Sequence, residues 1–150
     1  MMTSRSEYRL LHRQDNADKR LSGIGLRIGL VSEEQYRRVL DKYAAVDAEL
    51  RRLEKTHIAP SDGINALLTA RGTAEISTGS SLADLIRRPQ ISYRDLAEFD
   101  PERPELPRAV TEQAEISLKY EGYIKRQLKQ VEEFTRMESR PCPPTSTTTR

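Results

Sequence analysis

The chain has no tryptophan, and aromatic residues make up only 5% of its 150 residues. Its single cysteine, Cys142, excludes an internal disulfide and a zinc site built on several cysteines. The two histidines, His12 and His57, are far apart in the sequence and lack the close spacing of paired metal ligands, so we expect no metal site. No apolar run reaches the ~18 residues of a membrane span, and the charged first residues lack the core of a signal peptide. These absences predict a cytoplasmic protein that does not contact a membrane.

A catalytic arrangement is also missing from the sequence. Glu132 and Glu133 are adjacent acids on an expected helix and lack the apolar pocket of an acid–base pair. The glycines of residues 23–29 are spaced G-x-G-x-x-x-G without a preceding apolar strand, so they do not match a dinucleotide-binding loop. Cys142 lacks the organised neighbours that activate a thiol. We therefore expect no catalytic residue, and predict a binding or scaffold domain that is not an enzyme on its own.

The sequence does contain long amphipathic helices. From Pro107 to Arg140, apolar residues recur at intervals of three and four, which places them on one face of a single helix. They are Ile116, Tyr120, Tyr123, Ile124, Leu128, Val131 and Phe134. The prolines of residues 141–144 cannot continue this helix. We expect its apolar face to be buried, because such a helix is not stable alone in water.

A second long helix is predicted to begin after Ser32, which forms a capping box with Gln35. Its apolar residues follow a heptad spacing. They are Tyr36, Val39, Tyr43, Val46, Leu50 and Leu53. The pattern suits one half of an antiparallel pair inside a bundle, or alternatively a seam through which two copies dimerise.

Shorter elements complete the expected architecture. Serines predict short helices after Ser61, Ser81 and Ser92. Two short turns are expected within residues 15–28, the second capped by Ser22 and stopped by Gly29. No stretch alternates enough to predict a strand. The sequence therefore predicts an all-α fold, a helical bundle of two long helices plus several short helices, with a disordered C-terminal tail at residues 141–150.

Positive charge is concentrated at two places, although the net charge of +2 is too small to indicate nucleic-acid binding. If a helix follows Ser4, arginines recur every four residues along one stripe, an arrangement that suits phosphate binding; internal pairing with Asp15, Asp18 or another acid is the alternative. A second group lies on the non-apolar side of the last helix. That side is either solvated or a surface for an anionic partner.

Three segments together resemble a known family. They are residues 3–18 (TSRSEYRLLHRQDNAD), residues 81–96, and residues 119–127 (KYEGYIKRQ). They resemble the C-terminal region of the GidA/MnmG family, the tRNA uridine 5-carboxymethylaminomethyl modification enzymes, also called glucose-inhibited division protein A. The resemblance covers residues 1–140. Residues 141–150 depart from the family pattern, so we expect a disordered or non-native tail, such as a frameshifted ending; in-frame, family-like codons in the DNA would contradict that expectation.

The resemblance implies a role for the chain. Residues 1–140 would be the C-terminal helical domain of a larger flavoprotein whose FAD-binding domain is absent from this sequence. The family enzyme uses FAD, NADH and methylenetetrahydrofolate, and modifies the wobble uridine of tRNA together with the GTPase MnmE. Its members are expected to be homodimers. No cofactor is expected in this chain itself, and the implied task is recognition of tRNA and of MnmE.

We assign candidate residues to this recognition. The tRNA-binding candidates are Arg5, Arg9, Arg13, Arg20, Lys119, Lys125, Arg126 and Lys129. The partner-binding candidates are Tyr120, Tyr123, Ile124 and Leu128. The first arginines could instead face the absent FAD-binding domain. The alternative function is a structural or dimerisation module without nucleic-acid binding.

Overall fold

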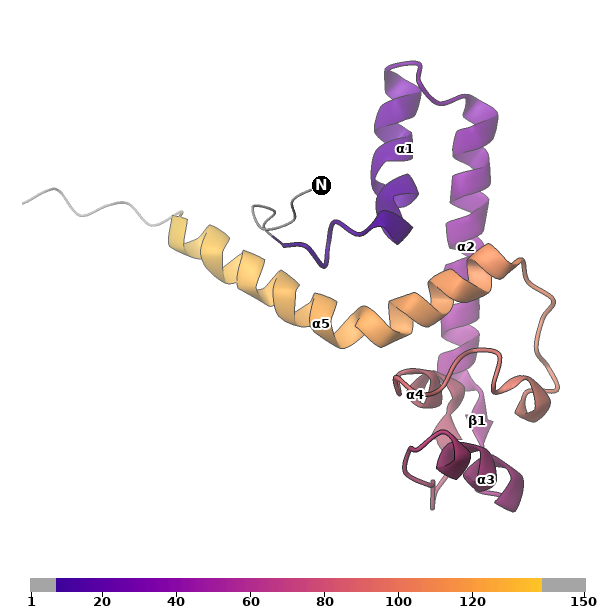
Figure 1. Cartoon of the computed structure of the whole chain (residues 1–150). Helices are drawn as coiled ribbons and strands as arrows, with labels where there is room; N and C mark the ends of the chain where they lie inside the picture. The colour runs from indigo at the N-terminus through magenta and orange to yellow at the C-terminus, as the bar shows by residue number, and fades with distance from the viewer. Residues whose placement is uncertain (1–7, 139–150) are drawn as a thin grey trace, which may run out of the picture.

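The computed structural model describes residues 8–138, and most of them are helical. The helical elements are η2 (Gln14–Asn16), α1 (Ala17–Arg27), α2 (Glu33–Lys55), α3 (Asp62–Ala70), α4 (Leu82–Ile86), η3 (Ala97–Phe99) and α5 (Arg108–Glu138). Figure 1 shows α1 and α2 side by side, α5 crossing α2, and the short elements gathered at the far end of α2. The predicted all-α fold with two long helices is confirmed. The tail predicted at residues 141–150 lies outside the described residues.

The first helix is longer than the sequence suggested. Instead of two turns separated by a cap at Ser22, one continuous helix, α1, contains Ser22 as a buried interior residue. Small residues are needed on this side of α1, because a Cβ added at Gly25 would lie 2.6 Å from Cγ2 of Val31. The helix ends at Arg27, and the predicted stop residue, Gly29, follows the C-cap Ile28 with a φ of 77° that favours glycine.

Helix α2 forms the axis of the domain. The predicted capping box is present: Ser32 Oγ accepts a hydrogen bond from the Gln35 N–H at 3.2 Å, and Gln35 Oε1 accepts one from the Ser32 N–H at 2.9 Å. Its heptad seam is used inside the chain. Tyr43 contacts the start of α1, Val46 packs with Val110 and Ala114 of α5, and Leu53 belongs to the main core. The centre of the seam is therefore not available to a second copy.

The main core lies at the C-terminal end of α2. It is formed by the fully buried side chains of Leu53, Ile64, Leu68, Leu82, Leu85, Ile86 and Ile91. Ser61 and Ser81 cap α3 and α4 as predicted. Ser92 and Asp95 also make the predicted hydrogen bonds, but they hold a turn that leads into η3 rather than an α-helix.

Two very short strands were missed by the sequence analysis. β1 (His57–Ile58) pairs antiparallel with β2 (Ser80–Ser81), with His57 opposite Ser81. Strands of two residues are too short to show an alternating pattern. The expectation of no strand was therefore wrong, although the pairing only ties together the two ends of the segment that contains α3.

Helix α5 has the predicted length but a different buried face. Its first half buries Val110, Gln113, Ala114 and Leu118 against the rest of the domain. The predicted apolar face is mostly exposed: Tyr123 is 60% exposed and Phe134 is 56% exposed. The prediction failed because α5 meets α2 and α4 only along its first half, as Figure 1 shows. No helix within residues 8–138 is both long and apolar enough to cross a membrane.

Candidate nucleic-acid interface

Arg9 and Arg13, the two described arginines of the expected stripe, do not lie on a common helix. Residues 8–11 form a turn, closed by a hydrogen bond of 2.8 Å from the Leu11 N–H to the Tyr8 carbonyl. Arg9 is exposed within this turn, and Arg5 lies outside the described residues. The helix after Ser4 on which the arginine stripe depended is not formed in the described part, because Tyr8 adopts a positive φ of 53° that a right-handed helix does not allow.

Arg13 holds the N-terminal segment to the domain. Its Nε and Nη2 each donate to Asp15 at 2.9 Å, and its Nη1 donates to the Leu10 carbonyl at 2.9 Å. Its guanidinium also lies 5.0 Å from the centre of the Tyr120 ring on α5. Hydrogen bonds from Arg13 lower the pKa of Asp15 below 3.8, against the opposing effect of partial burial. The geometry of Arg13 matches the internal-pairing alternative.

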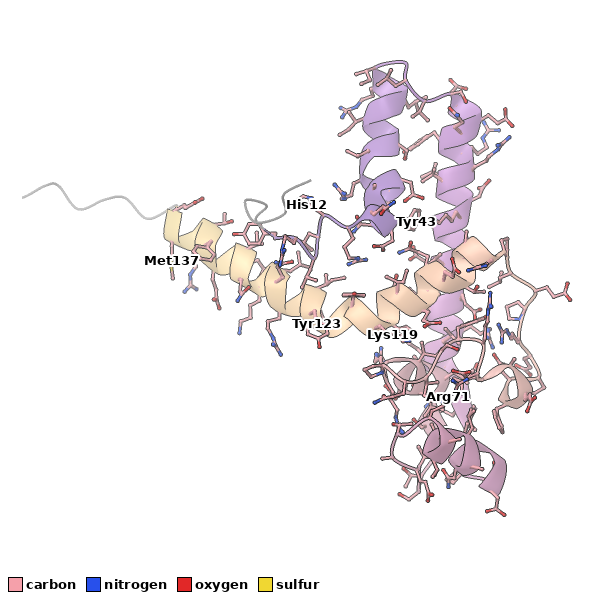
Figure 2. The ribbon with its side chains drawn as sticks, viewed as in Figure 1. His12, Tyr43, Arg71, Lys119, Tyr123 and Met137 are labelled. Atoms are coloured by element: carbon pink, nitrogen blue, oxygen red, sulfur yellow. The ribbon has the colours of Figure 1, made fainter. Side chains whose placement is uncertain are left out.

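Asp18 joins the start of α1 to α2. The Tyr43 hydroxyl donates to Asp18 Oδ1 at 2.6 Å, and the Lys42 ammonium donates to Oδ2 at 2.7 Å. Partial burial acts to raise the pKa of Asp18, but these hydrogen bonds outweigh it and lower the pKa below 3.8. Figure 2 shows Tyr43 at this junction. The acids near the first basic group are thus engaged by specific partners.

The cations of α5 fall into two classes. Lys119 is 24% exposed and donates to Glu115 at 2.7 Å, so it supports the helix. Lys125 is 74% exposed and pairs with Glu121 at 2.5 Å. Arg126 and Lys129 are exposed, and neither has a hydrogen-bond or ion-pair partner within residues 8–138. Exposed pairs such as Lys125–Glu121 contribute little energy, so Lys125 can exchange Glu121 for a phosphate at small cost.

Glu121 anchors this part of α5. It accepts hydrogen bonds from Arg87, beside α4, at 2.8 Å and 3.1 Å, and from Lys125 one turn further along. Hydrogen bonds from Lys125 and Arg87 lower the pKa of Glu121 below 4.5. Beyond this anchor, α5 projects away from the core (Figure 1).

The partner-binding candidates lie on this projecting half. Tyr120 is 39% exposed, Tyr123 60% and Leu128 45%, whereas Ile124 is half-buried. Figure 2 shows Tyr123 in the middle of α5 and Met137 near its end. Phe134 and Met137 extend the apolar surface, and neither was among the partner-binding candidates. Exposed tyrosine, phenylalanine and methionine side chains are typical of protein-binding surfaces.

A further basic group lies on α1, and the sequence analysis did not recognise it as a group. Lys19, Arg20 and Arg27 line one side of a hollow of about 340 Å³ between α1 and α2. Only Arg20 was a candidate. The signal was present in the sequence, because residues 19, 20, 23 and 27 share one face of a helix. It was overlooked because residues 15–28 were interpreted as two short turns.

The opposite side of the α1–α2 hairpin is apolar. An open groove of about 620 Å³ is lined by residues that include Leu21, Ile24, Ile28 and Leu30. These four side chains are between 46% and 78% exposed. No group of three or more His, Cys, Asp or Glu side chains in the described part of the chain is placed to hold a metal ion.

Comparison with known proteins identifies the family. A family model described as the tRNA modifying enzyme MnmG/GidA C-terminal helical domain matches residues 33–128. The chain belongs to the MnmG/GidA family. Its resemblance to this family, inferred above from three sequence segments, is thereby confirmed.

Individual MnmG and GidA proteins align along nearly the whole chain. The tRNA uridine 5-carboxymethylaminomethyl modification enzymes MnmG of Caldicellulosiruptor saccharolyticus and Lachnoclostridium phytofermentans are 54% and 48% identical to it over 143 residues. These alignments cover 95% of this chain and 23% of each relative. A crystal structure of Aquifex aeolicus GidA matches with a TM-score of 0.69 at 33% identity, covering 96% of this chain and 22% of that one. The chain thus spans less than a quarter of the MnmG relatives' length.

The MnmG resemblance implies an FAD site on a separate domain, and the described residues do not form a dinucleotide site of their own. A dinucleotide site needs a glycine-rich loop between a buried strand and a helix. Here Gly23 and Gly25 lie inside α1, and the strands within residues 8–138 are two residues long.

Proposed function

We propose that this chain is the C-terminal helical domain of a larger flavoprotein that modifies the wobble uridine of tRNA, and that the domain binds tRNA rather than catalysing the reaction. The family and the printed activity of its MnmG relatives support the reaction class. In the proposed whole protein, FAD and NADH belong to a separate FAD-binding domain. The proposal also includes a cytoplasmic location and a homodimeric whole protein.

One observation supports the recognition role most directly. The second half of α5 projects from the core with two different exposed faces. Lys125, Arg126 and Lys129 lie on the basic face. Tyr123 and Leu128 lie at the two borders of the apolar face, and Tyr123 lines a hollow together with Arg126. Cations that contact phosphates position RNA without reading its sequence. We therefore assign the basic face to tRNA and the apolar face to an MnmE-type GTPase.

The remaining tRNA candidates take lesser parts in this proposal. Arg20 donates from Nε to Asn16 Oδ1 at 2.9 Å but is otherwise exposed, so it remains available to RNA. Arg13 and Lys119 are held by Asp15 and Glu115, and we assign them to positioning the helices. Arg5 and Arg9 remain candidates for either tRNA or the FAD-binding domain.

The test combines two variants and two binding partners. Changing Lys125 and Arg126 together to Ala should weaken tRNA binding about tenfold and reduce the slope of log K against log salt by about 1.5, because two phosphate contacts are lost. The same variant should bind the cognate GTPase as the unmodified chain does. Changing Tyr123 and Leu128 together to Ala should have the opposite pattern, with weaker GTPase binding and unchanged tRNA binding. Fluorescence anisotropy at two salt concentrations measures both.

A matched control uses the outer face of α2. Arg38 is 73% exposed and pairs with Glu34 at 2.5 Å, as Lys125 pairs with Glu121. Changing Arg37 and Arg38 to Ala removes the same charge from a surface without an assigned role. An equal loss of tRNA affinity in this control, or unchanged tRNA affinity and salt slope in the Lys125/Arg126 variant, would contradict the assignment to α5.

A further inference from the structure

The basic hollow between α1 and α2 is distinct from the α5 surface. It is lined by residues that include Lys19, Arg20, Gly23, Arg27, Tyr36 and Leu40. Its volume of about 340 Å³ falls at the lower end of the range for small-molecule sites. Its walls differ in character, because α1 contributes three cations and α2 contributes aromatic and apolar side chains.

The charge in the hollow is positive. None of the described residues that line it is Asp or Glu. Arg27 has no hydrogen-bond or ion-pair partner among residues 8–138, and Arg20 uses Nε for Asn16 and Nη2 for a long contact of 3.4 Å to the Arg13 carbonyl. The neighbouring acid, Asp18, already accepts hydrogen bonds from Lys42 and Tyr43. An anion entering the hollow would therefore meet donors that no internal carboxylate neutralises.

An aromatic ring lies beside these cations. Tyr36 is half-buried on α2, and its Cε2 lies 3.7 Å from the position that a Cβ on Gly23 would occupy. The absence of a side chain at Gly23 therefore keeps the space next to the ring open. Tyr43 lies deeper, where its hydroxyl is bound to Asp18 and Lys19 lies 4.9 Å from its ring centre. The hydrogen bond to Asp18 thus holds Tyr43 in place at the inner end of the hollow, while Tyr36 and the arginines line its opening.

We propose that this hollow binds one unpaired nucleotide of RNA, with the base against Tyr36 and the flanking phosphates on Arg20 and Arg27. A ring beside a group of cations provides the two contacts that single-stranded nucleic acids use, base stacking and backbone neutralisation. A paired base is excluded because its faces are covered by its neighbours in the helix. The inference rests on the proposed function, because the nucleotide would belong to the tRNA that α5 contacts.

The experiment titrates the 150-residue chain with a fluorescently labelled single-stranded oligouridylate of eight nucleotides. The Tyr36→Leu variant should bind about tenfold more weakly, because stacking is lost, and the Tyr36→Phe variant should bind as the unmodified chain does. The Arg27→Gln variant should also weaken binding and lower the salt slope by about 0.7. The matched control is the Arg37→Gln variant, because Arg37 is an exposed arginine outside the hollow. It should change the binding affinity and the salt slope less than Arg27→Gln does. Circular dichroism confirms that each variant is folded.

Several results would overturn the inference. Unchanged affinity in the Tyr36→Leu variant would show that no base stacks there. An equal effect of Arg37→Gln and Arg27→Gln would show diffuse attraction to the surface. Oligoglutamate that binds as tightly as the oligonucleotide, and is weakened as much by Tyr36→Leu, would identify an acidic peptide as the ligand.

The Lys125/Arg126 variant separates this inference from the proposed function. If that variant binds tRNA normally while Tyr36→Leu weakens oligonucleotide binding, the α5 assignment fails and the hollow is retained. If the Lys125/Arg126 variant loses tRNA affinity while Tyr36→Leu has no effect, the α5 assignment is retained and the proposed nucleotide site in the hollow fails.

Discussion

The two ends of α2 have different environments. At the C-terminal end, Ile64, Leu68, Leu85 and Ile91 are 0% exposed. At the N-terminal end, the α1–α2 hairpin leaves Leu21, Ile24, Ile28, Leu30 and Leu40 between 46% and 78% exposed. The first end has the burial of a self-sufficient core, whereas the second has apolar surface that the described residues do not cover. Large exposed apolar patches mark interaction sites, so the difference separates a scaffold from the surfaces that it carries.

Polar networks repeat this contrast. Near the core, Arg52 donates to Glu49 at 2.7 Å and to Asp100 at 2.6 Å, and both carboxylates are at most 4% exposed. The Tyr93 hydroxyl donates to Glu49 at 2.8 Å, and burial together with this hydrogen bond raises the pKa of Tyr93 to about 12. In the hairpin, the Lys42–Asp18 pair is 25% and 35% exposed. The two cations are similarly exposed, so the networks differ in their carboxylates, which are buried near the core and partly exposed in the hairpin.

The largest expected effect compares two leucines. Leu68→Ala removes a side chain that is 0% exposed and should lower the free energy of unfolding by about 2–5 kcal/mol, because it leaves a cavity. Leu30→Ala, at a residue that is 78% exposed, should change it by less than about 0.5 kcal/mol. Urea denaturation of both variants measures the difference. Similar losses would show that the hairpin is packed as tightly as the core.

A second comparison uses the two ion-pair networks. Arg52→Met leaves two buried carboxylates without their cation and should lower the free energy of unfolding by about 3 kcal/mol. Lys42→Met removes a cation from a partly exposed pair and should cost less than about 1 kcal/mol. The same denaturation experiment at neutral pH tests both. Equal costs would contradict the difference in burial between the two networks.

The smallest expected effect is on the pH dependence of the hairpin. Because the pKa of Asp18 is lowered in the folded chain, Asp18 contributes stability above 3.8, its value when unfolded, and this contribution is lost as the pH falls through the folded value. The Asp18→Asn variant should therefore be less stable than the unmodified chain at pH 7, and the difference should shrink below about pH 4.

A neighbouring carboxylate supplies the control for this pH effect. Asp41 is exposed on α2, so the Asp41→Asn variant should follow the unmodified chain at every pH. A constant gap between the Asp18→Asn variant and the unmodified chain across the acid range would show that Asp18 acts through shape rather than through charge.

Local signals predicted the helices well. The Ser32–Gln35 capping box, the caps at Ser61 and Ser81 and the stop at Gly29 all lie where side chains and backbone within a few residues decide the outcome. The same local logic failed at Ser22. A serine can cap a helix or lie inside one, and contacts from outside α1 decided between the two.

The candidate interface was only partly predictable. The spacing of residues 119–129 indicated a basic side of α5, but it did not reveal that Lys119 is held by Glu115 while Arg126 is exposed. Arg13 was a candidate phosphate contact with pairing to Asp15 as the alternative, and the structure forms the Asp15 pair. The turn that brings the two side chains together leaves no periodic pattern in the sequence. The hollow beside Tyr36 brings together side chains from two helices, so helical spacing alone could show only its α1 half.

By itself, the sequence determined where α2, α3, α4 and α5 begin, that the long helices are amphipathic, and which family the chain resembles, because these properties depend on neighbouring residues and on residue identity. The tertiary structure alone decided which apolar face of α5 is buried, since that depends on where α2 and α4 cross it. It also decided which cations are bound by the chain's own acids and which remain exposed. The energy of such a contact depends on distances between residues far apart in the chain, and no periodic pattern along the chain carries that information.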